Sequence, residues 1–160
     1  MNKIASWILA SLLLLATGCA TVSTQYNTME SMKTYVFNES AEDVFAGVTQ
    51  VFTGDNNHLT STGKYMGVSP WRVRYKSQGS LSHNEKVRYN VAVSTVNGNQ
   101  TVVRIMRESI PDTSDPLNIG RLMGSEVLTP ETRRDIAYEF RILEHVNPSA
   151  AAAMKASAAK

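Results

Sequence analysis

The 160-residue sequence has only one cysteine, Cys19, so no disulfide can form within the chain. Positive and negative residues almost balance, with a formal net charge of +2, so no strong overall field would attract nucleic acid. After the first eighteen residues, no apolar run reaches the roughly 20 residues that a spanning helix needs. The folded part must therefore be held together by packing, as one domain of ordinary size.

The first residues have the layout of a secretory signal. Residues 1–3 are short and basic, and residues 4–16 are apolar except for two serines. This run has the length of the apolar part of a signal peptide and is too short to span a bilayer. Small residues follow at 16–18, as cleavage by a signal peptidase requires.

Cys19 directly follows this run, in the string Leu-Leu-Ala-Thr-Gly-Cys-Ala over residues 14–20. The string resembles the lipobox of bacterial lipoproteins, although Ala16 stands where that family usually has leucine. The resemblance implies cleavage before Cys19, a diacylglycerol on its thiol and a fatty acyl chain such as palmitate on the new amino group. Ala20 is not the aspartate that retains such proteins in the inner membrane, which implies the outer membrane, with the domain facing the periplasm. The alternatives are an ordinary signal peptide or a short membrane helix.

The rest of the chain divides by composition. We predict a lipoprotein signal peptide over residues 1–18 and a flexible tether, rich in Ser and Thr, over 19–32. An α+β domain is expected over 33–128 and a helical C-terminal segment over 129–160.

Periodicity predicts the elements of this domain. Residues 40–53 have apolar positions at helical spacing after Ser40 as N-cap. Period-two alternation and β-forming residues predict strands at 33–38, 59–66, 71–76, 87–94 and 100–108. Asn97-Gly98 predicts a tight hairpin turn. The expected fold is α+β, an antiparallel sheet of about four or five strands covered by one amphipathic helix. Thr129-Pro130 and Asn147-Pro148 would begin the helices of a C-terminal extension.

Residue types used in catalysis are present, but not in a recognisable arrangement. His58, His83 and His145 have no partner at metal-ligand spacing, and we expect them at the surface. The sequence predicts no catalytic residue, metal or cofactor. An enzyme acting on envelope material, with scattered site residues, remains an alternative.

Basic residues occupy alternate positions of the predicted strands. They are Arg72, Arg74, Lys76, Arg88 and Arg104, joined by Arg107. If the strand registers align, several share one sheet face that would bind lipid phosphate, peptidoglycan carboxylates or an acidic partner. The alternative is a solvated sheet face whose long side chains cover apolar surface.

Two further groups are candidates for binding. The segment 117–123, with Gly120 inside it and Gly124 directly after it as hinges, would dock to a partner or lie on the domain's own core. Tyr65, Trp71, Tyr75 and Tyr89 would line an aromatic groove or belong to the core of the sheet.

Residues 33–108, with the helix start at 40–45 followed by arginine-dotted strands, resemble the small domains of accessory lipoproteins in outer-membrane assembly machinery. The sequence thus predicts a membrane-anchored lipoprotein, a non-enzymatic binding or accessory component of an outer-membrane or periplasmic assembly. Its expected partners are membrane lipid, through Cys19, and an envelope protein, but no nucleic acid. A structural lipoprotein bound to the cell wall is another alternative.

Overall fold

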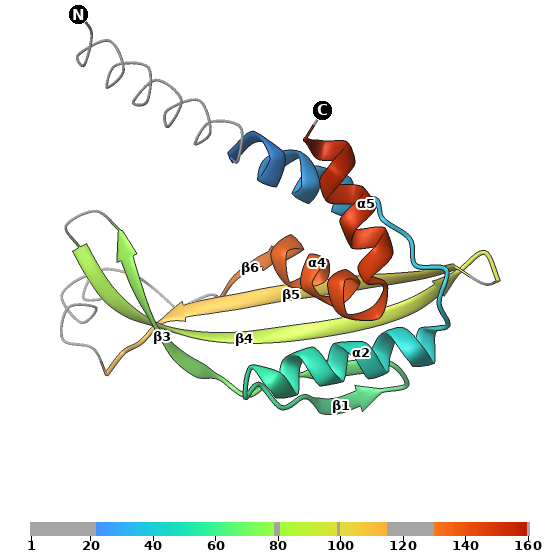
Figure 1. Ribbon diagram of the computed structural model, residues 1–160. Coiled ribbons are helices and arrows are strands. Elements are labelled where there is room, and N and C mark those ends of the chain that lie inside the picture. The colour runs from blue at the N-terminus through green and yellow to red at the C-terminus, as the bar shows by residue number, and fades with distance from the viewer. Residues whose placement is uncertain (1–21, 79–80, 99, 115–129, 160) are drawn as a thin grey trace, which may run out of the picture.

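The computed structural model describes residues 22–78, 81–98, 100–114 and 130–159 (Figure 1). Residues 22–32 form a helix, called the N-terminal helix below. The later elements are α2 (Ala41–Gly54), β1 (Thr60–Gly63), β2 (Met66–Val68), β3 (Arg72–Gln78), β4 (Leu81–Val96), β5 (Gln100–Pro111), β6 (Glu131–Arg134), α4 (Ile136–Val146) and α5 (Pro148–Ala158).

The strands form one six-stranded sheet in which every pairing is antiparallel. The long strand β4 is its centre, with β5 along one edge and both β2 and β3 along the other. The predicted α+β class is confirmed. The sheet exceeds the expected four or five strands because residues 59–66 form two strands rather than one and residues 131–134 add β6. The chain instead turns at Tyr65, at a positive φ of 62°, to make the β1–β2 hairpin.

The hairpin between β4 and β5 turns at Asn97 and Gly98, as predicted. Their φ values are 51° and 84°, in the left-handed region that a glycine or asparagine adopts at least cost. The turn fixes the register of the longest pairing in the sheet, which runs from Val96 opposite Gln100 to Glu85 opposite Pro111.

The core lies between one face of the sheet and two helices. Along β4, Val87, Tyr89, Val91 and Val93 are buried, and the residues between them are less so. Figure 1 shows α2 and α4 on the same side of the β4–β5 ribbon. The predicted helix at 40–53 is therefore confirmed as α2, with the Ser40 side chain accepting from the Asp43 amide.

The start of the chain differs from expectation. Residues 22–32 are helical and pack on the domain rather than forming a flexible tether, since Thr28 is 3% and Met32 2% exposed. The predicted strand at 33–38 is reduced to a single bridge between Phe37 and Thr101. Burial of apolar side chains outweighs the polar composition that suggested a tether.

The helix predicted to begin at Thr129-Pro130 was also placed wrongly. Residues 131–134 form β6, whose backbone pairs with the edge of β5, and α4 begins after Asp135. The Asp135 carboxylate accepts from the Tyr138 amide at 3.0 Å, so it supplies the cap expected of Thr129. The last predicted helix is confirmed as α5, where Asn147 caps the Ala150 amide.

Within the described residues, no helix has both the length and the apolar character that crossing a bilayer would require.

Candidate binding surfaces

The predicted arginines do not all share one face of the sheet. Arg72 lies opposite Val87, and Arg74 opposite Glu85, so both are on the face that α2 and α4 cover. Arg88 is next to Val87 on β4 and therefore projects from the other face, called the open sheet face below. Arg104, opposite Ala92, is also on the open sheet face. Several of the predicted cations thus share one sheet face, but it is the face that α2 and α4 cover, and Arg88 and Arg104 lie on the other.

The backbone register alone places Lys76, which lies opposite His83. Another predicted cation, Arg107, is on the helix-covered face. Arg107 lies opposite Tyr89 and forms an ion pair with the buried Glu85.

The open sheet face has a compact polar centre. The Glu108 carboxylate accepts from Arg88 Nε and from Asn90 Nδ2, each at 2.6 Å. The Arg88 guanidinium also lies over the Trp71 ring, 4.6 Å from its centroid. This arginine is thus paired and stacked, so its charge is already compensated within the protein.

Exposed apolar side chains lie on the same face, on either side of this centre along β4. Met66 lies opposite Ala92, Val73 opposite Lys86 and Tyr75 opposite Asn84, which places all three on the open sheet face together with Val96. Their exposed fractions are 47%, 55%, 71% and 40%. Large exposed apolar side chains on one sheet face are typical of interaction surfaces. Strand register, which the sequence does not reveal, places all four on the same face, spread along β4.

The four aromatic residues of the predicted groove are dispersed. Tyr89 is in the core, packed edge-on against Phe52 with ring centroids 5.6 Å apart. Tyr65 packs against Phe45, Trp71 stacks with Arg88, and Tyr75 is exposed. Tyr89 thus matches the alternative expectation of a core residue, and the half-buried Tyr65 packs against the core.

A second polar cluster joins the end of α2 to α4. The Asp55 carboxylate accepts two hydrogen bonds from the Arg141 guanidinium, at 2.7 and 2.9 Å, and another from the Tyr138 hydroxyl. The hydrogen bonds from Arg141, aided by that from Tyr138, lower the pKa of Asp55 to about 2. Burial and the bond to Asp55 raise the pKa of Tyr138 to about 12.

These shifts bear on the enzyme alternative, because Asp55 and Arg141 line a surface hollow of about 470 Å³ with His145. A general acid or base works best with a pKa near the working pH. Both shifts move the pKa away from pH 7, so the Asp55 carboxylate stays ionised and the Tyr138 phenol stays protonated. These properties suit a structural cluster, called the Asp55 cluster below, that holds the end of α2 against α4.

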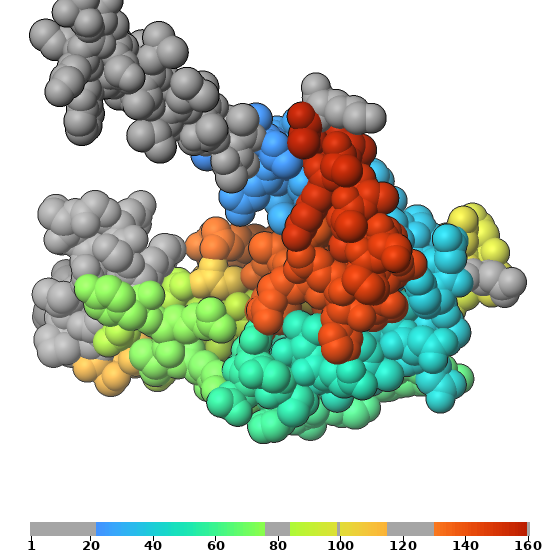
Figure 2. All heavy atoms as spheres, viewed as in Figure 1, coloured from blue at the N-terminus to red at the C-terminus, as the bar shows by residue number. Residues whose placement is uncertain are grey.

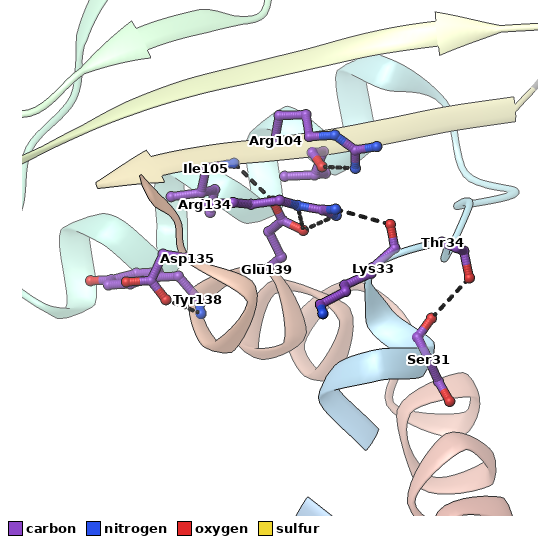
Figure 3. Close-up of polar contacts among 10 residues, drawn as sticks. Ser31, Lys33, Thr34, Arg104, Ile105, Arg134, Asp135, Tyr138 and Glu139 are labelled. Atoms are coloured by element: carbon purple, nitrogen blue, oxygen red, sulfur yellow. Dashed lines mark hydrogen bonds and ion pairs between the residues drawn. The ribbon is translucent and has the colours of Figure 1, made fainter. Parts of the chain in front are cut away.

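A third polar cluster lies where β6 leads into α4 (Figure 3). Glu139 is fully buried and accepts from Arg134 Nε at 2.9 Å and Nη2 at 2.6 Å. It also accepts from the Ile105 backbone amide at 3.0 Å, just beyond the β5–β6 pairing. Arg134 Nη1 donates to the Lys33 carbonyl at 3.0 Å. One carboxylate thus links α4, β5 and β6, and through Arg134 the segment after the N-terminal helix.

A groove of about 700 Å³ lies between the N-terminal helix, α4 and α5, and we call it the helical groove. Its walls include Thr28 and Met29, then Ala137 and Phe140 of α4, and Lys155 of α5. In Figure 2 this hollow lies where the blue N-terminal helix meets the orange and red C-terminal helices. Sequence reasoning missed it because its walls come from three segments far apart in the chain.

The histidines that the structure describes with side chains are exposed, as predicted. His58 is at the surface, and His145 Nε2 lies 2.6 Å from Gln50 Oε1. Across the described residues, no three His, Cys, Asp or Glu side chains converge to hold a metal ion. Cys19 and the candidate segment 117–123 lie outside the described residues.

Comparison of the chain with protein-family models, with curated proteins and with solved structures gives no match.

Proposed function

We propose that this protein is a lipid-anchored lipoprotein of the bacterial envelope and a non-enzymatic binding or accessory component of an outer-membrane or periplasmic assembly. Its anchor would be Cys19, in the outer membrane, with the domain facing the periplasm. The observation that carries the proposal is the position of the only cysteine at the end of a signal-like apolar run.

The N-terminal helix supports a position at the membrane surface. Val22 and Tyr26, one helical turn apart, are 69% and 65% exposed and follow Cys19 within seven residues. An aliphatic and an aromatic side chain beside an acyl anchor suit the bilayer interface, where tyrosine is enriched. Because this helix packs on the domain, the anchor would hold the domain close to the lipid.

The open sheet face supports a protein partner. Its exposed Met66, Val73 and Tyr75 share this face with Arg88, whose charge is already paired with Glu108. Such a surface suits a partner that offers apolar and aromatic side chains rather than a highly charged one. The partner would therefore be an envelope protein with a complementary apolar patch.

Replacing the anchor residue tests the first part of the proposal. In the native host, Cys19→Ser should abolish labelling by radioactive palmitate and release the protein from the membrane fraction or leave uncleaved precursor. Normal processing and membrane retention of this variant would contradict the proposal.

Replacing exposed residues of β3 tests the second part. Changing Val73 and Tyr75 together to Ser should remove partner crosslinks formed in intact envelopes, because it removes the apolar contacts. Arg72 and Arg74 changed together to Gln are the matched control, since they are exposed on the opposite face of the same strand. This control should keep the crosslinks and shift the melting temperature little. Crosslinks that survive the Val73 and Tyr75 changes would exclude the open sheet face.

A further inference from the structure

We propose that the helical groove binds one acyl chain of the lipid on Cys19 when the protein is not inserted in a bilayer. This inference rests on the lipid anchor of the proposed function and adds a binding site for it.

The distance is short enough. Cys19 precedes Val22, the first described residue of the N-terminal helix, by three residues, which span at most about 11 Å when fully extended. Thr24 and Gln25, within the first turn that the structure describes, already line the groove. A membrane acyl chain reaches about 15 Å, half of the hydrocarbon thickness of a bilayer. An acyl chain on Cys19 can therefore enter the groove from its N-terminal side.

The charged groups of the groove do not call for an ionic ligand. Lys155 pairs with Glu144 at 2.5 Å and lies over the Phe140 ring, 5.3 Å from its centroid. Arg141 pairs with Asp55 at 2.7 Å. The cations that line the groove are thus compensated within the protein, and the groove does not favour a phosphate or carboxylate ligand.

The Thr28 hydroxyl is satisfied within its own helix, since it donates to the Thr24 carbonyl at 2.7 Å. Apolar Met29 lines the groove on the same helix. Ala137 and Phe140 form the facing wall. Its volume of about 700 Å³ is within the usual range of small-ligand sites. An uncharged hydrocarbon chain fits this chemistry.

Whether the acyl chain occupies the helical groove depends on whether the protein is in water or in a bilayer. Each methylene removed from water contributes about 0.8 kcal/mol, so a chain in water gains by entering the groove. A chain already in a bilayer has no such gain, because lipid is as apolar as the groove. The chain is therefore expected in the groove in water and in the lipid at the membrane.

A photoreactive fatty acid tests this inference. A diazirine fatty acid is incorporated metabolically, and the mature lipoprotein is purified and irradiated below the critical micelle concentration of the detergent. Mass spectrometry should find the crosslink on Met29, Ala137 or Phe140 of the same chain. Reconstitution into phosphatidylcholine vesicles should reduce this crosslink at least fivefold and transfer it to lipid.

Two matched tryptophan variants locate the site. Ala137→Trp should fill the groove and lower the crosslink at least fivefold, whereas Ala153→Trp, on an exposed α5 position that does not line the groove, should leave it unchanged. Crosslinks spread over the surface in the wild-type protein, or unaffected by Ala137→Trp, would overturn the inference. If Ala137→Trp does not fold, the wild-type map decides alone.

The mass at Cys19 is measured on the same sample before irradiation. No acyl mass there refutes the proposed function itself. An acylated Cys19 with an unlabelled groove refutes only the assignment of the groove.

Discussion

Gly47 determines how closely α2 and α4 approach each other. A Cβ atom built on Gly47 would lie 2.4 Å from Val146 Cγ2, far inside van der Waals contact. By helix propensity alone, glycine in the middle of α2 is unfavourable by up to about 1 kcal/mol relative to alanine. Close packing of the two helices outweighs that preference, which is why the residue cannot be understood from its own helix.

Gly47→Ala should therefore destabilise the protein by about 1–3 kcal/mol, because Val146 is β-branched and has little freedom to move aside. Ala46→Gly, at the exposed neighbouring position, is the control and should cost no more than about 1 kcal/mol. Urea denaturation measures both. A stabilised Gly47→Ala variant would show that the helices are not in close contact.

Asp55 makes stability depend on acidity. Its pKa falls from 3.8 to about 2 on folding, so the ionised carboxylate stabilises the native state above about pH 4. That contribution is lost as the pH falls from about 4 to 2. Allowing for the half-exposed Arg141, it is on the order of 1 kcal/mol.

Asp55→Asn should lower the free energy of unfolding by about this amount at pH 6, and the difference from wild type should vanish near pH 2. Glu131→Gln, at an exposed position of β6, removes the same charge and should leave the pH profile unchanged. If the difference in free energy of unfolding between wild type and Asp55→Asn stayed constant from pH 6 to pH 2, the stabilising role of ionised Asp55 would be contradicted.

At the scale of elements, the sequence predicted the strongly periodic helix and hairpin correctly but missed β6, a short strand at the edge of the sheet. The apolar spacing after Ser40 predicted α2, and Asn97-Gly98 predicted the central hairpin. The interval before Asp135 was ambiguous because both Thr129 and Asp135 are good N-caps. Only the free hydrogen-bonding edge of β5 decides that residues 131–134 form a strand, and that edge depends on the tertiary fold.

The β5–β6 edge depends on the Glu139 side chain, which accepts hydrogen bonds from Ile105 and Arg134. Glu139→Ala should cost about 3–5 kcal/mol, because it leaves Arg134 without its buried partner and the Ile105 amide without an acceptor. Glu144→Ala, which removes an exposed pair on the same helix, should cost at most about 1 kcal/mol. Thermal unfolding followed by circular dichroism separates the two. Equal losses of stability in the two variants would mean that the buried Glu139–Arg134 pair stabilises the fold no more than the exposed pair.

At the scale of the whole molecule, the two candidate surfaces depend on information that the sequence does not reveal. A shift of one residue in strand register would exchange the two faces of β3 and move Val73 and Tyr75 to the helix-covered side. The helical groove combines residues 24–29 with residues more than a hundred positions later. The sequence thus predicts the anchor and the α+β class, whereas the surfaces emerge only from packing.

The whole molecule also sets how the anchor would act. The N-terminal helix is tied to the C-terminal helix, since Asn27 Nδ2 donates to the Ala158 carbonyl at 3.3 Å, and Met32 is part of the core. An anchor on Cys19 would therefore restrain the orientation of the domain as well as its distance from the lipid. The open sheet face would then be presented to partners at a fixed distance from the membrane surface.

The mass of the N-terminal peptide, from protein isolated from its native host, decides whether Cys19 is the lipid anchor. We expect a peptide that begins at Cys19 and carries a diacylglycerol and a third acyl chain. A peptide that retains residues before Cys19, or has an unmodified thiol, would contradict it.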